Sequence, residues 1–425
     1  MDFWVKLVPF FVVLLTFPSF AQWVELPIGN TTVWWVTDFF TLYAFYHFRK
    51  QYYRKNEYPK TIKFFLIWVV ISAIYGCYMA DYYWDYKLLI NNLMIYLMGL
   101  TFFYLSIPEN ISKISRQWCC FAIVVFWFFL PFMQLEAPGK FLSPFAFFVI
   151  FWPFYEKKWK IIVIFFSLAV FIYGSLGARS TAIRFAFAFL VSFAFLKIDV
   201  LSLRFIKRIT CLLALAPFLF LILGLTGVFN IWKMNDYLGD KEILVVSSYT
   251  TAGNNNTSEN LKSDTRSFIY EETISSAIVH NYIIQGHSLA RGYDSPFFSW
   301  MMDRQFAGTV YHKGERQSCE VAILNIFTYM GLIGVCLYGL IFLNAILNVF
   351  RYSNNKCLFI IALYVSFRWA FAWMEDFTRF DLNNLYLWVV LSMCYSPYFL
   401  QMSDNDFKMW AYNIFHHPSK RINLM

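Results

Sequence analysis

The sequence carries little charge. Only 14% of its 425 residues are Asp, Glu, Lys or Arg, whereas soluble domains average about 25%. Hydrophobic residues make up 59% of the chain and aromatic residues 22%. Such a chain has too little polar surface to cover itself as a soluble globule, so most of its apolar surface must face lipid or other helices. The composition therefore predicts an integral membrane protein.

The common motifs of soluble enzymes are also missing. The sequence has no phosphate-binding loop of the GxxxxGK[ST] type, no HExxH and no GxSxG. Its eight cysteines include no CxxC pair, and no His/Cys group has the spacing of a metal site. These absences argue against ATP hydrolysis and zinc chemistry, and we expect no metal and no cofactor.

Long apolar runs dominate what is present. A helix that crosses roughly 30 Å of hydrocarbon needs about 17 to 25 predominantly apolar residues, and we count twelve such segments. The fold class that we predict is therefore an all-α polytopic membrane protein. The twelve predicted spans are residues 4–20, 31–48, 64–80, 88–105, 118–133, 141–155, 161–177, 181–196, 209–229, 320–343, 358–374 and 384–400.

Lys and Arg concentrate in alternate connections between these spans, as in RKQYYRKNEYPKTIK and EKKWK. Because cytoplasmic loops carry the excess of Lys and Arg, this pattern predicts that both termini are cytoplasmic. The net charge of +9 is then a topology signal, and we expect no nucleic-acid partner. The first segment also fits a signal peptide, although we favour an uncleaved helix.

The chain divides around one long polar segment. Residues 1–229 hold the first nine spans, residues 230–319 form a large outer loop, residues 320–400 hold the last three spans, and residues 401–425 form a cytoplasmic tail. We expect the loop to be mainly helical. It contains an extended piece (ILVVSSYTT), a linker (AGNNNTSEN) and a helix in SDTRSFIYEETISSAIVHN. The apolar face of that helix is predicted to dock on the membrane domain through Tyr270, Ile274, Ala277 and Ile278.

The turn GARSTAIR carries Arg179 and Arg184 between the seventh and eighth spans. Ser180 and Thr181 are predicted to cap the helix that follows, and a helix amino terminus beside arginines favours anions. Arg184 falls inside the apolar run, where a charge costs about 2.5 to 3.5 kcal/mol on insertion scales. It therefore needs a partner or an aqueous cavity, unless it snorkels to the outer interface.

Other polar residues are candidates for similar reasons. Arg368, in SFRWAFAWMED, needs an anionic partner such as Glu375, Asp376 or a ligand. Arg266 lies in the first turn of the loop helix, where the helix dipole disfavours a cation, so either it serves a ligand or it is simply solvated. Asp81 and Asp85 lie among Tyr and Trp, which suits either sugar binding or an interfacial aromatic belt.

Taken in order, three segments carry a resemblance to bacterial O-antigen polymerases and ligases. GARSTAIR resembles the Ser-Arg-Ser type turn of that family, SDTRSFIYEE followed by IIQGHS resembles its large periplasmic loop, and ERQSCEVAILNIFTYMGLIGVCLYGL resembles the helix that follows the loop. The resemblance implies that ligases carry a His-Asn pair eleven residues before the glycine that is Gly331 here. Glu320 and Val321 stand in that place, which is more like the polymerases. His287-Ser288 after Gly286, without a second glycine, departs from the family pattern.

The resemblance implies a glycosyltransferase at the periplasmic face of the inner membrane. Its donor would be a glycan on undecaprenyl diphosphate, its acceptor a lipid-linked repeat unit, and a chain-length regulator is a candidate partner. Arginines would neutralise the departing diphosphate; we expect Arg266 and Arg179 to do this, with substrate-binding support from Arg291, Arg184, Arg368 and His287. Glu320 is the expected general base and His287 the second choice.

Two other functions fit parts of this pattern. An O-antigen ligase shares the lipid-linked donor and the large loop. A lipid-linked oligosaccharide flippase or other transporter can also have twelve helices with charges lining a path. The sequence shows no internal repeat, and a large outer loop has no evident use in transport, so polymerase is the favoured function.

Overall fold

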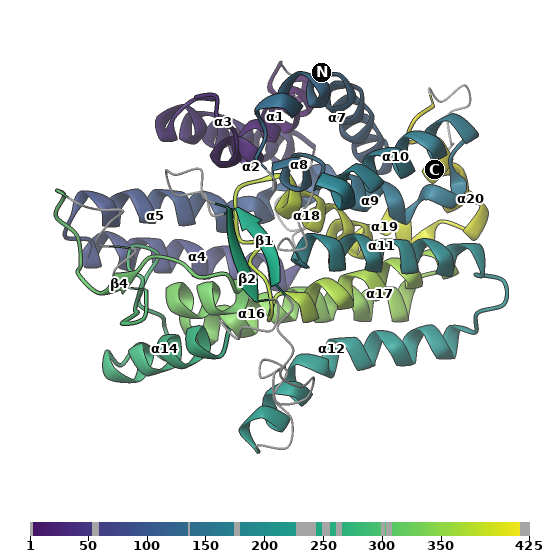
Figure 1. Cartoon of the computed structure of the whole chain (residues 1–425). Coiled ribbons are helices and arrows are strands. Elements are labelled where there is room, and N and C mark those ends of the chain that lie inside the picture. Colours follow the sequence, from purple (N-terminus) through teal and green to yellow (C-terminus); the bar gives the residue numbers. More distant parts are fainter. Residues whose placement is uncertain are drawn as a thin grey trace.

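The computed structural model describes residues 3–52, 59–134, 137–173, 179–226, 244–248, 256–260, 266–298, 302 and 308–416. The chain is mostly helical (Figure 1). Before the polar segment lie α1 (Phe3–Leu14), α2 (Thr16–Phe20), α3 (Thr31–Tyr52), α4 (Lys60–Met79), α5 (Tyr83–Tyr96), α6 (Phe102–Leu105), α7 (Pro108–Phe129), α8 (Ala137–Phe141), α9 (Phe145–Ile150), α10 (Lys157–Tyr173), α11 (Arg179–Leu196) and α12 (Leu203–Leu225). After it come α16 (Ala322–Tyr352), α17 (Lys356–Phe371), α18 (Leu382–Tyr395), α19 (Pro397–Gln401) and α20 (Asp404–Tyr412).

Within the described ranges, six helical stretches are long and apolar enough to cross a membrane. They are Phe3–Trp23, Lys60–Met79, Tyr83–Leu105, Pro108–Phe132, Leu203–Leu223 and Ala322–Tyr352. A shorter apolar helix covers Ser180–Leu196. Helix is present in each of the twelve predicted ranges. In the sixth, short helices replace one long one, and Pro144 stands at the start of α9.

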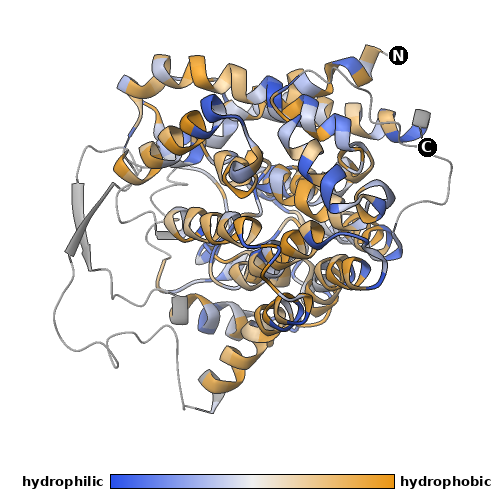
Figure 2. Ribbon diagram, turned by 90° about the vertical axis from the view of Figure 1, so that its right-hand side faces the viewer, coloured by the Kyte–Doolittle hydropathy of each residue, from blue (hydrophilic) through white to orange (hydrophobic). Residues whose placement is uncertain are grey.

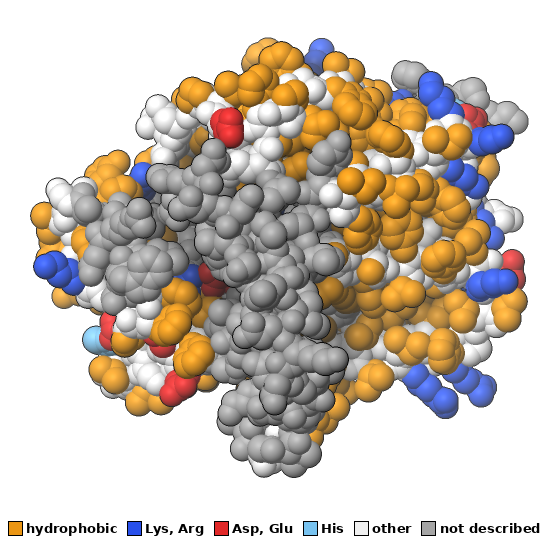
Figure 3. Space-filling model, in the orientation of Figure 1, with side chains coloured by type: hydrophobic (Ala, Val, Ile, Leu, Met, Phe, Trp, Pro, Cys, Tyr) orange, Lys and Arg blue, Asp and Glu red, His pale blue; other side chains and the backbone are white. Residues whose placement is uncertain are grey.

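Many hydrophobic side chains remain exposed on the outer helices. On α12 they include Leu212 (61% exposed), Leu215 (62%) and Ile222 (57%). The ribbon in Figure 2 is coloured hydrophobic over much of the helical body, and Figure 3 shows hydrophobic side chains over much of the face in view. Lys and Arg gather at the edge of Figure 3 where α11 passes into α12 in Figure 1. Apolar sides with charge collected at an end are typical of a membrane-embedded bundle.

Among the longer described helices, α17 and α18 are the most buried. Ile360, Ile361 and Val365 of α17 are fully buried, as are Leu387 and Val389 of α18. Helix α17 packs against α11, α12, α16 and α18, which places it at the centre of the carboxy-terminal half of the bundle. A charged side chain on α17 is therefore held in the interior of the protein rather than against lipid.

The expectation of a mainly helical outer loop is wrong for the described part of residues 230–319. One long helix is present, α14 (Arg266–Val279). Strands β1 (Leu244–Ser248) and β2 (Asn256–Asn260) form one antiparallel pair, and β3 (Tyr293–Asp294) and β4 (Glu315–Arg316) form another. Part of the expected linker thus becomes strand β2, because its backbone pairs with the β-branched run of β1.

The expected docking face of α14 is also partly wrong. Ile269, Thr273 and Ala277 are fully buried, whereas Ile274 is 45% exposed and Ile278 is 60% exposed. The small side chain of Ala277 and the satisfied hydroxyl of Thr273, which donates to the Ile269 carbonyl at 2.7 Å, allow this face to approach α16 closely. From the predicted face, Tyr270 does make contact, and its hydroxyl donates to the Trp373 carbonyl at 2.6 Å.

Helix α16 is broken at Gly331, whose backbone is not helical (φ 66°, ψ −167°). The loop segment 282–287 fills the break. Leu332 N and Ile333 N donate to the carbonyls of Ile283 and Ile284 at 2.9 and 3.2 Å, and the Trp68 indole donates to the Met330 carbonyl at 3.0 Å. Irregular backbone at membrane depth is tolerated where protein satisfies it. The break therefore fastens the polar segment 230–319 directly to one of the long apolar helices.

Candidate functional site

A polar pocket lies where the first turn of α11 meets the end of α17 and the connection from α17 to α18. Ser180 and Thr181 of α11 line it, and they occupy the first helical turn rather than the capping position that we expected. Four cationic residues and three acidic residues line the same pocket: Lys140, Arg184, Arg368 and Arg379, and Glu375, Asp376 and Asp381.

Arg184 and Arg368 are the most deeply buried cations of the pocket. Arg184 is 7% exposed and Arg368 is 3% exposed. Among the described residues, Arg184 Nε and both Nε and Nη2 of Arg368 have no hydrogen-bond partner. Arg368 Nη1 donates to Asn383 Oδ1 at 3.3 Å, and its guanidinium lies 4.9 Å from the centre of the Phe377 ring.

The acidic residues of the pocket do not neutralise these two arginines by direct contact. Among the described residues, no ion pair joins Arg184 or Arg368 to a carboxylate. Asp376 accepts hydrogen bonds from Thr378 and lies 3.6 Å from Arg379 Nε. Asp381 caps α18 by accepting from Asn384 N at 2.9 Å, and burial raises the pKa of its carboxyl group.

The arrangement thus leaves two buried guanidinium groups without a matching anion. Burying an unpaired charge costs several kcal/mol, so a site of this kind is stable only if water or an anionic ligand reaches it. The planar fork of Arg suits bidentate contacts to carboxylate or phosphate oxygens. Backbone N–H groups of the first turn of α11, which lack partners inside that helix, favour an anion at the same place. The pocket therefore has groups that could bind an anion.

The expected catalytic arginines stand at the starts of two helices. Arg179 is the first residue of α11, and Arg266 is the first residue of α14. The side chains of both arginines lie outside the part of the chain that the structure describes. The predicted meeting of Arg179 with Arg266 at one diphosphate therefore stays a prediction, although the backbone places Arg179 directly beside the pocket residues Ser180 and Thr181.

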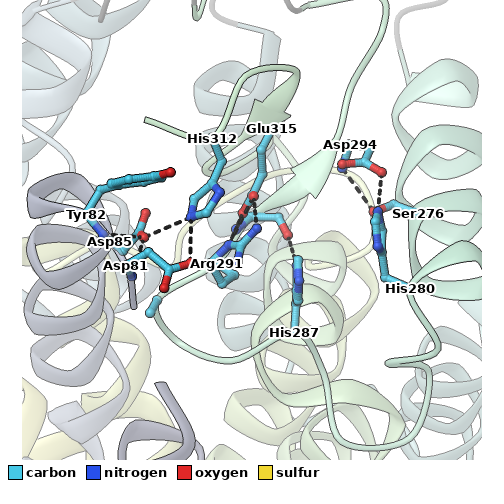
Figure 4. Close-up of polar contacts among 12 residues, drawn as sticks. Asp81, Tyr82, Asp85, Ser276, His280, His287, Arg291, Asp294, His312 and Glu315 are labelled. Carbon is cyan, nitrogen blue, oxygen red and sulfur yellow. Dashed lines mark hydrogen bonds and ion pairs between the residues drawn. The ribbon is translucent and has the colours of Figure 1, made fainter. Parts of the chain in front are cut away.

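Arg291 belongs to a different group of contacts, inside the polar segment 230–319 (Figure 4). Its guanidinium pairs with Glu315, with Arg291 Nη2 at 2.8 Å from Glu315 Oε2. Glu315 is 7% exposed, and its carboxylate also accepts from Gly292 N. Arg291 therefore already has a carboxylate partner, and it does not line the pocket with Arg184 and Arg368.

Glu320 is likewise paired. Arg316 Nη2 lies 2.6 Å from one of its carboxylate oxygens, while the other oxygen is buried and has no hydrogen-bond partner among the described residues. Arg316 is itself 5% exposed and lies 4.1 Å above the ring of Phe298. Sequence reasoning missed Arg316, although its i,i+4 spacing from Glu320 in ERQSCE was a signal.

Glu320 lies next to the wall of the pocket without lining it. Ala322 N, two residues later, donates to the Glu375 carbonyl at 3.3 Å, and Ile323 N donates to the Ala372 carbonyl at 3.1 Å. These bonds join the start of α16 to the connection that carries the pocket residues Glu375 and Asp376. The backbone just after Glu320 thus contacts the connection that carries pocket residues, while the carboxylate of Glu320 pairs with Arg316.

His287 is packed inside the loop. Its ring stacks on Tyr282 with centroids 4.5 Å apart, and its Nδ1 lies 2.7 Å from the Gly292 carbonyl oxygen. A carbonyl accepts only from a protonated nitrogen, so Nδ1 carries the hydrogen. Burial lowers the pKa of His287, which favours the neutral ring. His287 is therefore better suited to holding the loop together than to binding an anion by charge.

Outside this pocket, the described residues bring one group with metal-ligand chemistry together, namely Asp81, Asp85 and His312. Because His312 follows Asp85 by 227 positions, no local spacing in the sequence predicts this group.

Comparisons of the chain with protein-family models, with curated proteins and with solved structures gave no match. The function must therefore be argued from the residues and their geometry.

Proposed function

We propose that this chain polymerises lipid-diphosphate-linked oligosaccharide repeat units into O-antigen or a related surface polysaccharide at the periplasmic face of a bacterial inner membrane. The observation that carries the proposal is the pocket in which Arg184 and Arg368 are buried without an anionic partner. A diphosphate is dianionic or more, and two guanidinium groups match its oxygens in charge and in shape.

The proposed reaction is a glycosyl transfer. A hydroxyl of the incoming lipid-linked repeat attacks the anomeric carbon of the growing glycan, and the bond from that carbon to the diphosphate oxygen breaks. The released undecaprenyl diphosphate carries away the electron pair of that bond, and Arg184 and Arg368 stabilise the negative charge as it develops. The proton of the attacking hydroxyl passes to a general base, for which Glu320 is our choice because it lies beside the pocket wall.

The outer position of the pocket follows from the proposed topology. With both termini cytoplasmic and twelve spans, the start of α11, the end of α17 and the segment 230–319 all lie on the periplasmic side. Reporter fusions test this. A fusion after Asn56 should be active only with a cytoplasmic reporter, and one after Gly308 only with a periplasmic reporter. The reverse pattern would contradict the proposed side for the pocket.

The function itself is tested in the native host. Deleting the gene should remove long surface chains and leave a single repeat attached to its acceptor, and wild-type protein should restore the long chains. Loss of every attached form, with glycan left on the lipid carrier, would instead indicate a ligase or a flippase.

Complementation with point variants ties the activity to the pocket. We expect Arg184→Gln and Arg368→Gln to lose about 100-fold or more of the polymerising activity, a typical loss when one stabiliser of developing charge is removed. Arg116→Gln is the control, because Arg116 bonds only to the carbonyls of Asn413 and Ile414 in the described structure. Full activity of both pocket variants, at normal protein levels, would refute the proposed role of the pocket.

A further inference from the structure

Two carboxylates and one imidazole converge at the end of the molecule where α5 begins (Figure 4). Asp81 lies in the turn between α4 and α5, Asp85 lies in the first turn of α5, and His312 comes from the polar segment. His312 Nε2 is 3.0 Å from Asp85 Oδ2 and 3.8 Å from Asp81 Oδ2. One ligand atom from each residue lies within 4.8 Å of the others.

These separations suit a shared metal ion. Ligands around zinc lie at about 2.0 to 2.2 Å from the ion when they are imidazole nitrogen or carboxylate oxygen. An ion placed between these three ligand atoms can lie near the zinc–ligand distance from each of them. Three protein ligands leave a fourth position of a tetrahedral site open to water, as in many zinc sites.

Two of the three donor groups, those of Asp85 and His312, are held in place before any ion binds. Asp85 Oδ2 accepts from the backbone N–H groups of Asp81 and Tyr82 at 2.9 and 3.0 Å, and the Asp85 side chain is only 7% exposed. The ring of His312 packs against Tyr82 with centroids 4.7 Å apart. A fixed carboxylate and a fixed imidazole lower the entropic cost of binding an ion.

The local charge also favours a divalent cation. Asp81 and Asp85 together carry two negative charges, whereas the nearby guanidinium of Arg291 is already paired with Glu315. Lys87 lies over the Trp84 ring at 4.5 Å, and among the described residues no ion pair joins it to either Asp. With His312 neutral, as a metal ligand must be, a divalent ion would balance both carboxylates.

We propose that Asp81, Asp85 and His312 bind one zinc ion, which fastens residues 308–316 of the polar segment to the amino terminus of α5. The site combines imidazole and carboxylate ligands, a donor set that suits zinc better than calcium or magnesium. It is separate from the Arg184–Arg368 pocket, so it stands whether or not the chain is a polymerase. The competing arrangement is a plain ion pair between protonated His312 and the two carboxylates.

The test uses the full chain purified in detergent, stripped with a chelator and then dialysed against a chelator-free buffer. Zinc is titrated by calorimetry, and bound zinc is counted by mass spectrometry. We expect one zinc per chain for the wild type, and binding at least 10-fold weaker for Asp81→Asn and His312→Gln. Asp81 is the preferred position, because its side chain is 62% exposed and an Asn there keeps its shape.

His280→Gln is the matched control. His280 is also paired with an Asp in the same polar segment, with Nε2 at 2.5 Å from Asp294 Oδ2, but it belongs to no group of three metal-type ligands in the described structure. It should bind zinc as the wild type does. A wild-type protein that binds no zinc, or an Asp81→Asn variant that binds zinc as tightly as the wild type, would overturn the proposal. Zinc should also raise the melting temperature of the wild type, and it should raise that of Asp81→Asn by less at the same zinc concentration.

Discussion

Gly286 of the polar segment 230–319 and Gly331 of α16 lie against each other at the break in that helix. A Cβ atom on Gly286 would lie 2.4 Å from Met330 N and 2.5 Å from Gly331 N, and a Cβ atom on Gly331 would lie 2.2 Å from the Ile284 carbonyl oxygen. Both glycines also have positive φ, +83° and +66°. Neither backbone leaves room for a side chain on the other, so the loop and the broken helix require glycine at both positions.

This contact predicts a large loss of stability for Gly286→Ala and Gly331→Ala. Positive φ alone costs an L-residue roughly 1 to 2 kcal/mol, and forced overpacking adds about 1 to 3 kcal/mol. Thermal unfolding in detergent should show the loss, and hydrogen exchange should quicken in residues 282–287.

Gly314→Ala separates the cost of positive φ from the cost of the close contact. Gly314 has φ +81°, but a Cβ atom there would meet nothing within 4 Å. This variant should therefore lose only the roughly 1 to 2 kcal/mol that positive φ demands. Equal losses for Gly314→Ala and Gly331→Ala would show that the close contact at the break contributes nothing.

We expect Arg184 to destabilise the protein when no ligand is bound, although the proposed reaction requires it. We expect Arg184→Met to keep or raise the melting temperature, because replacing a buried charge with an apolar side chain is often neutral or stabilising by about 1 to 4 kcal/mol. The same variant should lose polymerising activity. A clear drop in melting temperature would indicate that Arg184 already has a partner within the protein.

Arg291→Met is the counterpart with the opposite expectation. Its removal would leave Glu315, which is 7% exposed, as a buried charge without its ion-pair partner. Breaking such a pair typically costs about 3 to 5 kcal/mol. The comparison of these two variants, measured by thermal unfolding, distinguishes an arginine kept for a ligand from one kept for the fold.

The apolar helices were predictable from the sequence, as was the enclosure of Arg184 and Arg368 away from lipid. Hydropathy acts over whole segments, and a charge inside an apolar run stands out regardless of its neighbours. Their sharing of one pocket was not predictable, because α11 and α17 meet only through tertiary packing. For the same reason, the sequence did not predict that His312 lies close to Asp81 and Asp85.

The face of α14 was mispredicted for a related reason. Helical spacing correctly placed Ala277 in the buried face. It also favoured Ile274 and Ile278, which are exposed, whereas Ile269 and Thr273 are buried instead. Close packing against α16 favours small side chains and a hydroxyl that bonds to its own helix. The spacing of apolar residues alone predicts neither preference. The ion pair of Arg316 with Glu320 was present in the sequence as an i,i+4 spacing but was not weighed.

Glu320→Gln tests the general base. Glutamine keeps the shape of the side chain and still accepts from Arg316, but it takes up no proton. We expect the polymerising activity to fall by about 100- to 10,000-fold at matched protein levels. The melting temperature should also fall, because the buried Arg316 loses its charged partner. Glu272→Gln is the control, because Glu272 accepts from Ser295 Oγ and Phe297 N in the same segment without lining the pocket. Normal chain lengths with Glu320→Gln would assign the base to another residue.

We expect His287 to make the stability of the protein depend on pH. Burial lowers the pKa of His287 in the folded protein, whereas an unfolded His titrates near 6.5. Below about pH 6.5 the unfolded chain therefore binds more protons at this position, so its contribution makes the protein less stable as the pH falls. The slope is at most about 1.4 kcal/mol per pH unit. His287→Phe keeps the ring against Tyr282 and cannot titrate. Between pH 7.5 and 5.5 the wild type should lose more melting temperature than His287→Phe, and equal losses would show that His287 is not held neutral.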